Sequence, residues 1–296
     1  MEDTMKHQVK KVGWYLLFTF PLLFIFTTVV IVPFFVGLGY SFYSWDGLPV
    51  NPRIFVGFEN FVRLMSDQRF WNASMRTVTF TVIAVITINV LGLTFALIAT
   101  SKLRTRNIGR TMLFMPFLVG GLILGYIWRF ILGDGLHILG NITGLDNIFF
   151  NWLIHPQFAF YAMILVATWQ MAGYIMIIYI TGIQAIPEDV IEAAGVDGAG
   201  FWTTLFKIKF PLIMPSFTIC LFMTLNNSFK MFDVNLSLTG GGPANATELF
   251  AMNIFNEIFS LHNLGYGQAK AIVFFIIVAV ITLFQVQMTK KREVMM

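Results

Sequence analysis

Long apolar stretches alternate with short polar segments along the whole chain. Six stretches without Asp, Glu, Lys or Arg are long enough for a membrane-spanning helix, which needs about 20 apolar residues and no charge at its centre. They lack the two-residue alternation of barrel strands, and only helices and closed barrels satisfy their backbone in lipid. We therefore predict helical spans at residues 14–43, 76–100, 110–131, 158–184, 209–231 and 268–288.

This pattern predicts an all-α membrane protein with six transmembrane helices. We expect a transmembrane domain at residues 14–290, with short tails at 1–13 and 291–296 and a loop at 185–208 between the fourth and fifth spans. A cleaved signal peptide is the alternative for the first span, because lysines precede it. Its apolar stretch is too long and no small-x-small site follows, which favours a retained anchor.

Composition and charge agree with a membrane protein. The chain is 57% hydrophobic and 11% charged, whereas a soluble domain is roughly 45–50% apolar and about 25% charged. Six spans place both termini on one side, and with the termini inside, 12 of the 19 Lys and Arg residues are cytoplasmic. The positive-inside rule supports this orientation. The net charge of +4, without a long basic run, gives no sign of a nucleic-acid partner.

Several classes of chemistry have no visible residues in this sequence. No P-loop, H-E-x-x-H pair or G-x-S-x-G elbow occurs, and the one cysteine, Cys220, excludes a multi-cysteine metal site. We therefore expect no catalytic residue, no metal site and no cofactor bound by this chain. The spans hold almost no ionisable residues, which argues against an ion-coupled carrier, although an uncharged uniporter remains possible.

The loop between the fourth and fifth spans carries the most specific pattern. Pro187 suits the first position of a helix, and Glu188 follows in the first turn, where the helix dipole favours acids. Gly198 or Gly200 can end this helix. We predict a short cytoplasmic helix, with Glu188 and Glu192 on one face. A solvated loop helix and a docking site for a partner both fit this composition.

The sequence after Pro187 resembles the E-A-A signature of importer-type ABC permeases. Glu192-Ala193-Ala194 is followed by Asp197-Gly198-Ala199 and then by Phe206, Ile208, Pro211 and Pro215. The resemblance implies a type I ABC importer permease fold in which this cytoplasmic coupling helix sits in a cleft of a separate ATPase subunit. The residues that it assigns to ATPase coupling are Glu188, Glu192, Ala193, Ala194, Gly195, Asp197 and Gly198.

Two further segments resemble the carbohydrate branch of that family. Val56–Phe61 with Phe70–Ala73 is similar to its outer-loop segment, although Arg76 stands where the family often has Asn. Thr239–Pro243 resembles the glycine–proline loop of maltose-permease F-type and glycerol-phosphate A-type subunits. The likeness runs from about residue 14 to 290. The very large outer insertion of some maltose permeases is missing here.

The resemblance also implies a set of partners and a location. These are a second homologous permease subunit, two copies of an ABC ATPase that uses ATP and Mg, an extracytoplasmic solute-binding protein, a sugar substrate and membrane lipid. The location is the inner or plasma membrane of a prokaryotic cell. Transport would proceed by alternating access, driven through the coupling helix.

A sugar needs hydrogen-bonding groups and flat aromatic faces along its path. In the sugar branch, the equivalent stretches of spans four and five line the site. The matching residues here are Trp169, Gln170, Tyr174, Thr224, Asn226, Asn227, Ser228 and Lys230. Polar residues also join helices to one another, and Trp and Tyr also mark lipid interfaces. A phosphorylated substrate would need positive charge, which only Lys230 and Lys270 offer, so a neutral sugar is weakly favoured.

Two other classes of function compete with this interpretation. A stand-alone facilitator or ion-coupled carrier would transport without an ATPase partner. A non-transporting membrane assembly protein would show no substrate-dependent stimulation of an ATPase. Neither explains an E-A-A helix on the cytoplasmic side.

Overall fold

The computed structural model is mostly helical and describes residues 15, 17–101 and 105–291. Within these residues, five helices are long and apolar enough to cross a membrane: Leu17–Tyr40, Gln68–Ala99, Gly121–Thr143, Pro156–Gln184 and Leu264–Lys290. A bent helix pair, Phe201–Leu212 and Met214–Phe229, brings the number to six if it forms one span. The predicted all-α membrane fold is therefore confirmed. The tail at 1–13, residues 292–296 of the other tail, and the basic loop residues Lys102 and Arg104 lie outside the described residues.

The chain divides into two compact units. The first contains the chain up to Ser66 together with Ile254–Val273. In it, β1 pairs antiparallel with β2, with Tyr43 opposite Phe55 and Ser44 opposite Ile54. Its elements are η1 (Thr27–Ile31), α2 (Val32–Tyr40), β1 (Tyr43–Ser44), β2 (Ile54–Phe55), α3 (Glu59–Met65), η6 (Asn256–Ser260) and the start of α15 (Leu264–Lys290).

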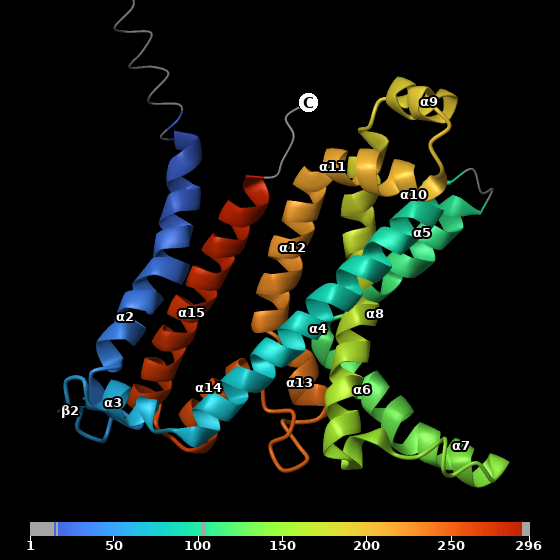
Figure 1. Cartoon of the computed structure of the whole chain (residues 1–296). Coiled ribbons are helices and arrows are strands. Elements are labelled where there is room, and N and C mark those ends of the chain that lie inside the picture. The colour runs from blue at the N-terminus through green and yellow to red at the C-terminus, as the bar shows by residue number, and fades with distance from the viewer. Residues whose placement is uncertain (1–14, 16, 102–104, 292–296) are drawn as a thin grey trace, which may run out of the picture. The chain divides into compact units, whose positions relative to one another are not determined.

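The second unit contains Asp67–Asn253 and the chain from Phe274 onward, so the division falls within α14 and α15. Figure 1 shows both units with their element labels. The elements of the second unit are α4 (Gln68–Ala99), α5 (Arg106–Phe114), η2 (Met115–Leu118), α6 (Gly121–Phe130), η3 (Ile131–Gly135), α7 (Leu136–Thr143), η4 (Trp152–Ile154), α8 (Pro156–Gln184), α9 (Glu188–Val196), α10 (Phe201–Thr203), η5 (Thr204–Lys209), α11 (Phe210–Leu212), α12 (Met214–Phe229), α13 (Asp233–Leu238), α14 (Phe250–Phe255) and the end of α15.

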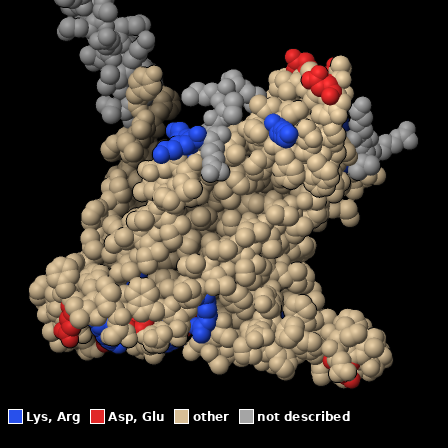
Figure 2. Space-filling view, in the orientation of Figure 1, with Lys and Arg blue, Asp and Glu red and all other residues tan. Residues whose placement is uncertain are grey.

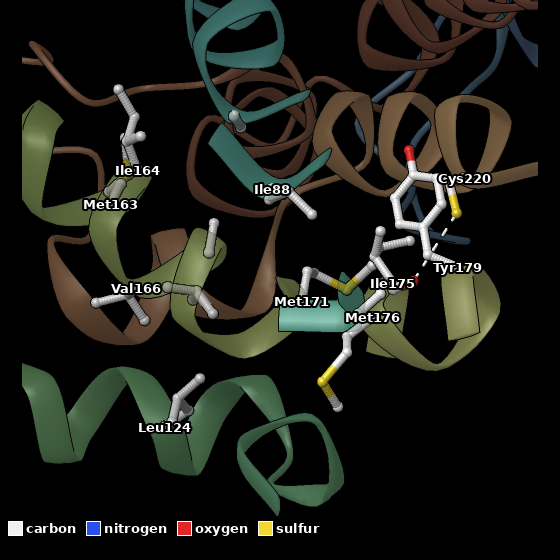
Figure 3. Packing of buried hydrophobic residues seen from close by; sticks show 14 of the residues in the cluster. Ile88, Leu124, Met163, Ile164, Val166, Met171, Ile175, Met176, Tyr179 and Cys220 are labelled. Atoms are coloured by element: carbon white, nitrogen blue, oxygen red, sulfur yellow. Dashed lines mark hydrogen bonds between the residues drawn. The ribbon is translucent and has the colours of Figure 1, made fainter. Parts of the chain in front are cut away.

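Helix α8 forms the centre of the second unit. It is apolar on every face, as expected for a helix surrounded by others, and it packs against α4, α12 and α5. Its buried side chains, among them Met163, Val166 and Ile175, meet Ile88 of α4 and Leu124 of α6 (Figure 3). A ligand between these helices would therefore contact α8.

The third predicted span, residues 110–131, is not one helix. Helix α5 ends at Phe114, a 3₁₀ turn follows, and Val119 is extended before α6 begins at Gly121. Pro116 within this turn has no N–H to continue an α-helical ladder, which explains the break. The apolar helix resumes as Gly121–Thr143 and passes through a π-helical segment at Ile131–Gly135.

The fifth predicted span, residues 209–231, also differs. The helix begins earlier, at Phe201, and bends by 74° at Ile213 before α12. Pro215 lies just beyond this bend, and its ring cannot be accommodated in a straight continuation of the preceding turn. The predicted helices at 76–100, 158–184 and 268–288 are each present but longer, at Gln68–Ala99, Pro156–Gln184 and Leu264–Lys290.

Candidate functional site

A polar cavity of about 250 Å³ lies where α6, α8, α12 and α13 meet. Its polar walls come from Gln170 on α8, Asn227 at the end of α12, and Lys230 and Asp233 just beyond it. Phe117 adds an aromatic face. The cavity thus combines amides, one cation, one anion and a flat ring, a set suited to a polyhydroxylated ligand.

Several polar atoms at this cavity have no hydrogen-bond partner among the described residues. The Gln170 amide donates to the Val119 carbonyl (3.1 Å), and the Asn227 amide donates to the Met223 carbonyl (2.9 Å). Their side-chain oxygens accept no hydrogen bond from the described part of the chain, and Lys230 forms no ion pair with it. These groups are therefore available to a ligand.

The eight predicted path residues occupy three different environments. Gln170, Asn227 and Lys230 line the polar cavity, whereas Asn226, with Lys230, lines a more apolar cavity between α12 and α15. Tyr174 stacks on the cavity residue Phe117 with ring centroids 4.3 Å apart, and Trp169 packs edge-on against Trp128. Thr224 and Ser228 are buried between helices, at 0% and 2% exposure.

Thr224 belongs to a buried network that our sequence analysis missed. The Asn89 amide donates to the Thr224 hydroxyl (3.0 Å), and the Tyr179 hydroxyl donates to the Asn89 side-chain oxygen (2.7 Å). The three residues come from α12, α4 and α8. A lone Asn within the apolar run 76–100 was the signal that could have indicated such a contact, because a buried amide in lipid needs partners.

The short helix predicted after Pro187 is present as α9, Glu188–Val196. Pro187 precedes its first turn, and Gly198 ends it with φ +75°, a conformation that favours glycine. The Gly198 N–H donates to the Gly195 carbonyl (3.1 Å) and the Ala199 N–H to the Ala194 carbonyl (2.9 Å). This pair of bonds is a Schellman cap, so the sequence Asp197-Gly198-Ala199 defines where α9 stops.

The two faces of α9 have different surroundings. Glu192, Ala193 and the terminal residues Gly195, Asp197 and Gly198 are exposed, whereas Ala194 is buried against the chain itself. Of the two alanines that the resemblance assigns to ATPase coupling, only Ala193 is exposed. Glu188 and Glu192 both line a cavity of about 640 Å³, together with Arg106 and Lys209. No ion pair joins these four side chains within the described residues.

Comparison with known proteins identifies the family. The model of the family described as "Binding-protein-dependent transport system inner membrane component" matches residues 88–293. The chain belongs to this family.

Two relatives extend the match over most of the permease chain. The probable starch degradation products transport system permease protein AmyD of Thermoanaerobacterium thermosulfurigenes is 45% identical over 283 residues, 96% of each chain. The multiple sugar-binding transport system permease protein MsmF of Streptococcus mutans is 32% identical over 262 residues, 88% of this chain and 90% of that one.

Solved structures share the permease fold. A chain of a bacterial ABC transporter involved in the import of the acidic polysaccharide alginate superposes with a TM-score of 0.82 at 20% identity, covering 97% of this chain and 98% of that chain. A chain of the alginate transporter in complex with a periplasmic protein bound to an alginate pentasaccharide gives a TM-score of 0.77, also at 20% identity, covering 96% of each.

The glycine–proline loop of this permease is held by a second buried network. The Asn235 amide donates to the Thr247 carbonyl (2.8 Å) and to the Thr239 hydroxyl (3.1 Å), and the Thr247 hydroxyl donates to the Gly242 carbonyl (2.6 Å). Asn235 is fully buried. The loop motif was visible in the sequence, but the role of Asn235 was not, because its partners include Thr247, 12 residues away, Leu249, 14 residues away, and Met163 of α8, 72 residues away.

Lys270, the second cation that we considered for a phosphorylated substrate, has a different role. It is fully buried and donates to the Glu257 carboxylate (2.7 Å). Its ammonium group also lies 4.7 Å from the centroid of the Tyr266 ring. A lysine neutralised in this way does not supply free positive charge to a substrate.

Proposed function

We propose that this chain is the membrane-spanning permease subunit of an ATP-driven ABC importer that carries a neutral sugar. The observation that carries the proposal is the polar cavity at Gln170, Asn227 and Lys230. Gln170 lies on α8, which precedes α9 in the chain, and Asn227 lies on α12, which follows α9 after the bent segment Phe201–Leu212. Two amide oxygens without protein partners suit hydroxyl groups. The names of AmyD and MsmF, which refer to starch degradation products and multiple sugars, support this substrate class.

The charges at the cavity favour a neutral substrate over a phosphorylated one. Lys230 is the one cation that lines it, and Asp233 lines it too. Since a phosphate would be attracted by one group and repelled by the other, the net attraction is small. A sugar hydroxyl can donate to the carboxylate and accept from the ammonium group.

The proposal includes a set of partners for this chain. The cavity of about 250 Å³ is smaller than the roughly 300–1,000 Å³ of ordinary ligand sites, which supports a second homologous permease subunit that completes its wall. Two copies of an ABC ATPase would bind below and use ATP and Mg, and an extracytoplasmic binding protein would deliver the sugar. This chain itself would bind no cofactor and hydrolyse no ATP. Both termini would be cytoplasmic in a prokaryotic cell membrane.

The mechanism is alternating access driven from α9. Helix α8 leads into α9 through Ala185–Pro187, and α9 leads through the bent segment Phe201–Leu212 into α12. A movement of α9 would therefore tilt α8 and α12, the two helices that carry Gln170 and Asn227. The cavity between them would then open to each side in turn.

The test begins with the tagged chain purified gently from its own membranes, with its partners identified by mass spectrometry. We expect a second six-span permease and a P-loop ATPase. The recovered complex and its binding protein, in proteoliposomes, should take up radiolabelled malto-oligosaccharide only when ATP is present on the ATPase side. Uptake by the chain alone would indicate a facilitator and contradict the proposal.

Substitution of Asn227 tests whether the transported sugar binds in the polar cavity. Asn227→Ala should raise the half-saturating sugar concentration about fivefold, which corresponds to the roughly 1 kcal/mol of one neutral hydrogen bond. Thr94→Val is the matched control, because Thr94 also donates to a carbonyl four residues earlier but is exposed and lines none of the cavities described above. Equal uptake constants in the two variants would place the sugar path elsewhere.

A further inference from the structure

Three large aromatic side chains stand exposed on the segment between α9 and α12. Phe201, Trp202 and Phe206 are 64%, 67% and 60% exposed. The rings of Trp202 and Phe206 stack nearly parallel, with centroids 5.8 Å apart, and Phe201 meets Trp202 edge-on at 5.2 Å. Such a contiguous apolar surface marks an interaction site.

The segment is amphipathic, so the aromatic surface is one defined face. Leu205 is buried at 6% exposure, and Phe210 packs against Phe217 of α12 with centroids 5.2 Å apart. The segment is therefore held to the rest of its unit by one side, and the described residues leave its aromatic side exposed.

The direction of the segment differs from that of the spans. Phe201–Leu212 is bent by 74° from Met214–Phe229. In Figure 1 it runs across the ends of the neighbouring helices in its unit, and α9 lies beyond it. A helix with this direction and composition is suited to lie in the plane of a membrane interface, with its apolar face about 5–10 Å into the headgroup region.

The positions of the acidic and basic side chains support contact between the aromatic face and lipid. The acidic side chains of α9, which include Glu188, Asp189 and Glu192, form the tip in Figure 2, where an anionic bilayer surface would repel them. The segment Phe201–Leu212 carries the aromatic residues together with Lys207 and Lys209, and Lys209 also lines the cavity that Glu188 and Glu192 line. Trp rings are enriched at the headgroup level, and lysines close to an anionic leaflet are attracted to it.

We propose that Phe201, Trp202 and Phe206 anchor the segment Phe201–Leu212 in the cytoplasmic interface of the bilayer. The anchor fixes the depth of α9, so that a force on α9 bends the joint at Ile213 rather than displacing the whole segment. The inference depends on the cytoplasmic orientation of α9 and is independent of which substrate is carried.

Site-directed nitroxide labelling measures how deeply a labelled residue of the segment Phe201–Leu212 lies in the bilayer. The one native cysteine, Cys220, is fully buried, so the unsubstituted chain reports background labelling. Phe206→Cys places the label on the aromatic face while Trp202 and Phe201 remain, and Thr203→Cys is a second exposed position in case the first variant does not insert. Val196→Cys, at 88% exposure on α9, is the matched control.

The full chain in vesicles of phosphatidylethanolamine and phosphatidylglycerol is then compared with the same vesicles after its ATPase partner is added. We expect the label at residue 206 to collide readily with oxygen and poorly with a water-soluble nickel chelate, with no change on adding the ATPase. The label at 196 should show the opposite preference. Two results would overturn the anchor. The first is that, without the ATPase, the nickel chelate reaches the label at residue 206 as readily as the label at residue 196. The second is that the label at residue 206 becomes protected from the chelate only after the ATPase is added. Failure of sugar uptake would leave these readings unaffected.

Discussion

The hydroxyl of Tyr179 makes a hydrogen bond in an apolar interior, and its removal should be measurable. Tyr179→Phe leaves the Asn89 side-chain oxygen without its 2.7 Å donor. Interhelical hydrogen bonds in membranes contribute about 0.6 kcal/mol on average and up to about 1.7, and we expect a loss in the upper part of that range because the site is fully buried. The measurement is the unfolding free energy in detergent.

Tyr174→Phe is the control on the same helix. Among the described residues, the Tyr174 hydroxyl hydrogen-bonds only to the Met223 sulfur, at 3.8 Å, and sulfur is a weak acceptor. This variant should unfold almost like the parent. If both variants lose the same stability, the Asn89 network does not contribute what its geometry indicates.

The ion pair of Lys270 and Glu257 gives a second prediction at the residue scale. The two side chains are 0% and 6% exposed. Lys270→Met leaves a buried carboxylate without its cation and should cost about 3–5 kcal/mol. The double variant Lys270→Met/Glu257→Gln should recover more than half, because the charge is removed and the new amide oxygen still accepts from Asn263. Chemical unfolding curves of the parent, the single variant and the double variant measure these free energies. A double variant as unstable as Lys270→Met would contradict the expected recovery.

Two helices approach so closely at one point that a methyl group does not fit. A Cβ atom added at Gly173 of α8 would lie 1.8 Å from the Leu113 carbonyl oxygen of α5. Because that atom belongs to the backbone, α5 must move as a whole, and Gly173→Ala should destabilise the chain by about 1–3 kcal/mol.

Gly109→Ala provides the comparison on α5 itself. Apart from the adjacent residues and backbone of α5 itself, no atom of the described residues lies within 4 Å of a Cβ built there, and alanine is favoured over glycine in a helix by about 0.5–1 kcal/mol. This variant should therefore be as stable as the parent or more stable. Opposite melting shifts in the two variants are expected in a thermal scan, and a shared downward shift would contradict the close contact at Gly173.

At the scale of the whole molecule, the proposed function makes α9 the point where force from an ATPase enters. Glu192→Lys reverses the charge on its exposed face, and we expect it to abolish ATP-dependent uptake while the protein still inserts at the normal level. The uptake assay is paired with quantification of the chain in purified membranes. Normal uptake at normal expression would remove α9 from the coupling role.

Glu192→Ala distinguishes two kinds of coupling contact. An exposed ion pair contributes about 0–1 kcal/mol, whereas breaking a buried one costs about 3–5. A mild defect would indicate a contact at the rim of the ATPase cleft, and a severe defect would indicate one that is enclosed.

The sequence by itself determined four of the six apolar spans, the short helix α9 and the family, whereas the spans predicted at 110–131 and 209–231 are broken and bent. Each of these depends on local composition or on residues close together in the chain: charge-free runs set the spans, and Asp197-Gly198-Ala199 sets the end of α9. Local composition was enough to predict a helical span because lipid offers no hydrogen-bond partners, so the backbone must satisfy its own hydrogen bonds within each segment.

Only the tertiary structure decided how the polar residues are used. It separated Gln170, Asn227 and Lys230, which line one cavity, from Thr224, which is buried in a network with Asn89 and Tyr179. It also paired Lys270 with Glu257 and bent the chain at Ile213. A polar side chain in an apolar helix needs a partner, but its identity depends on which other helix lies opposite, and the pattern along one segment does not contain that information.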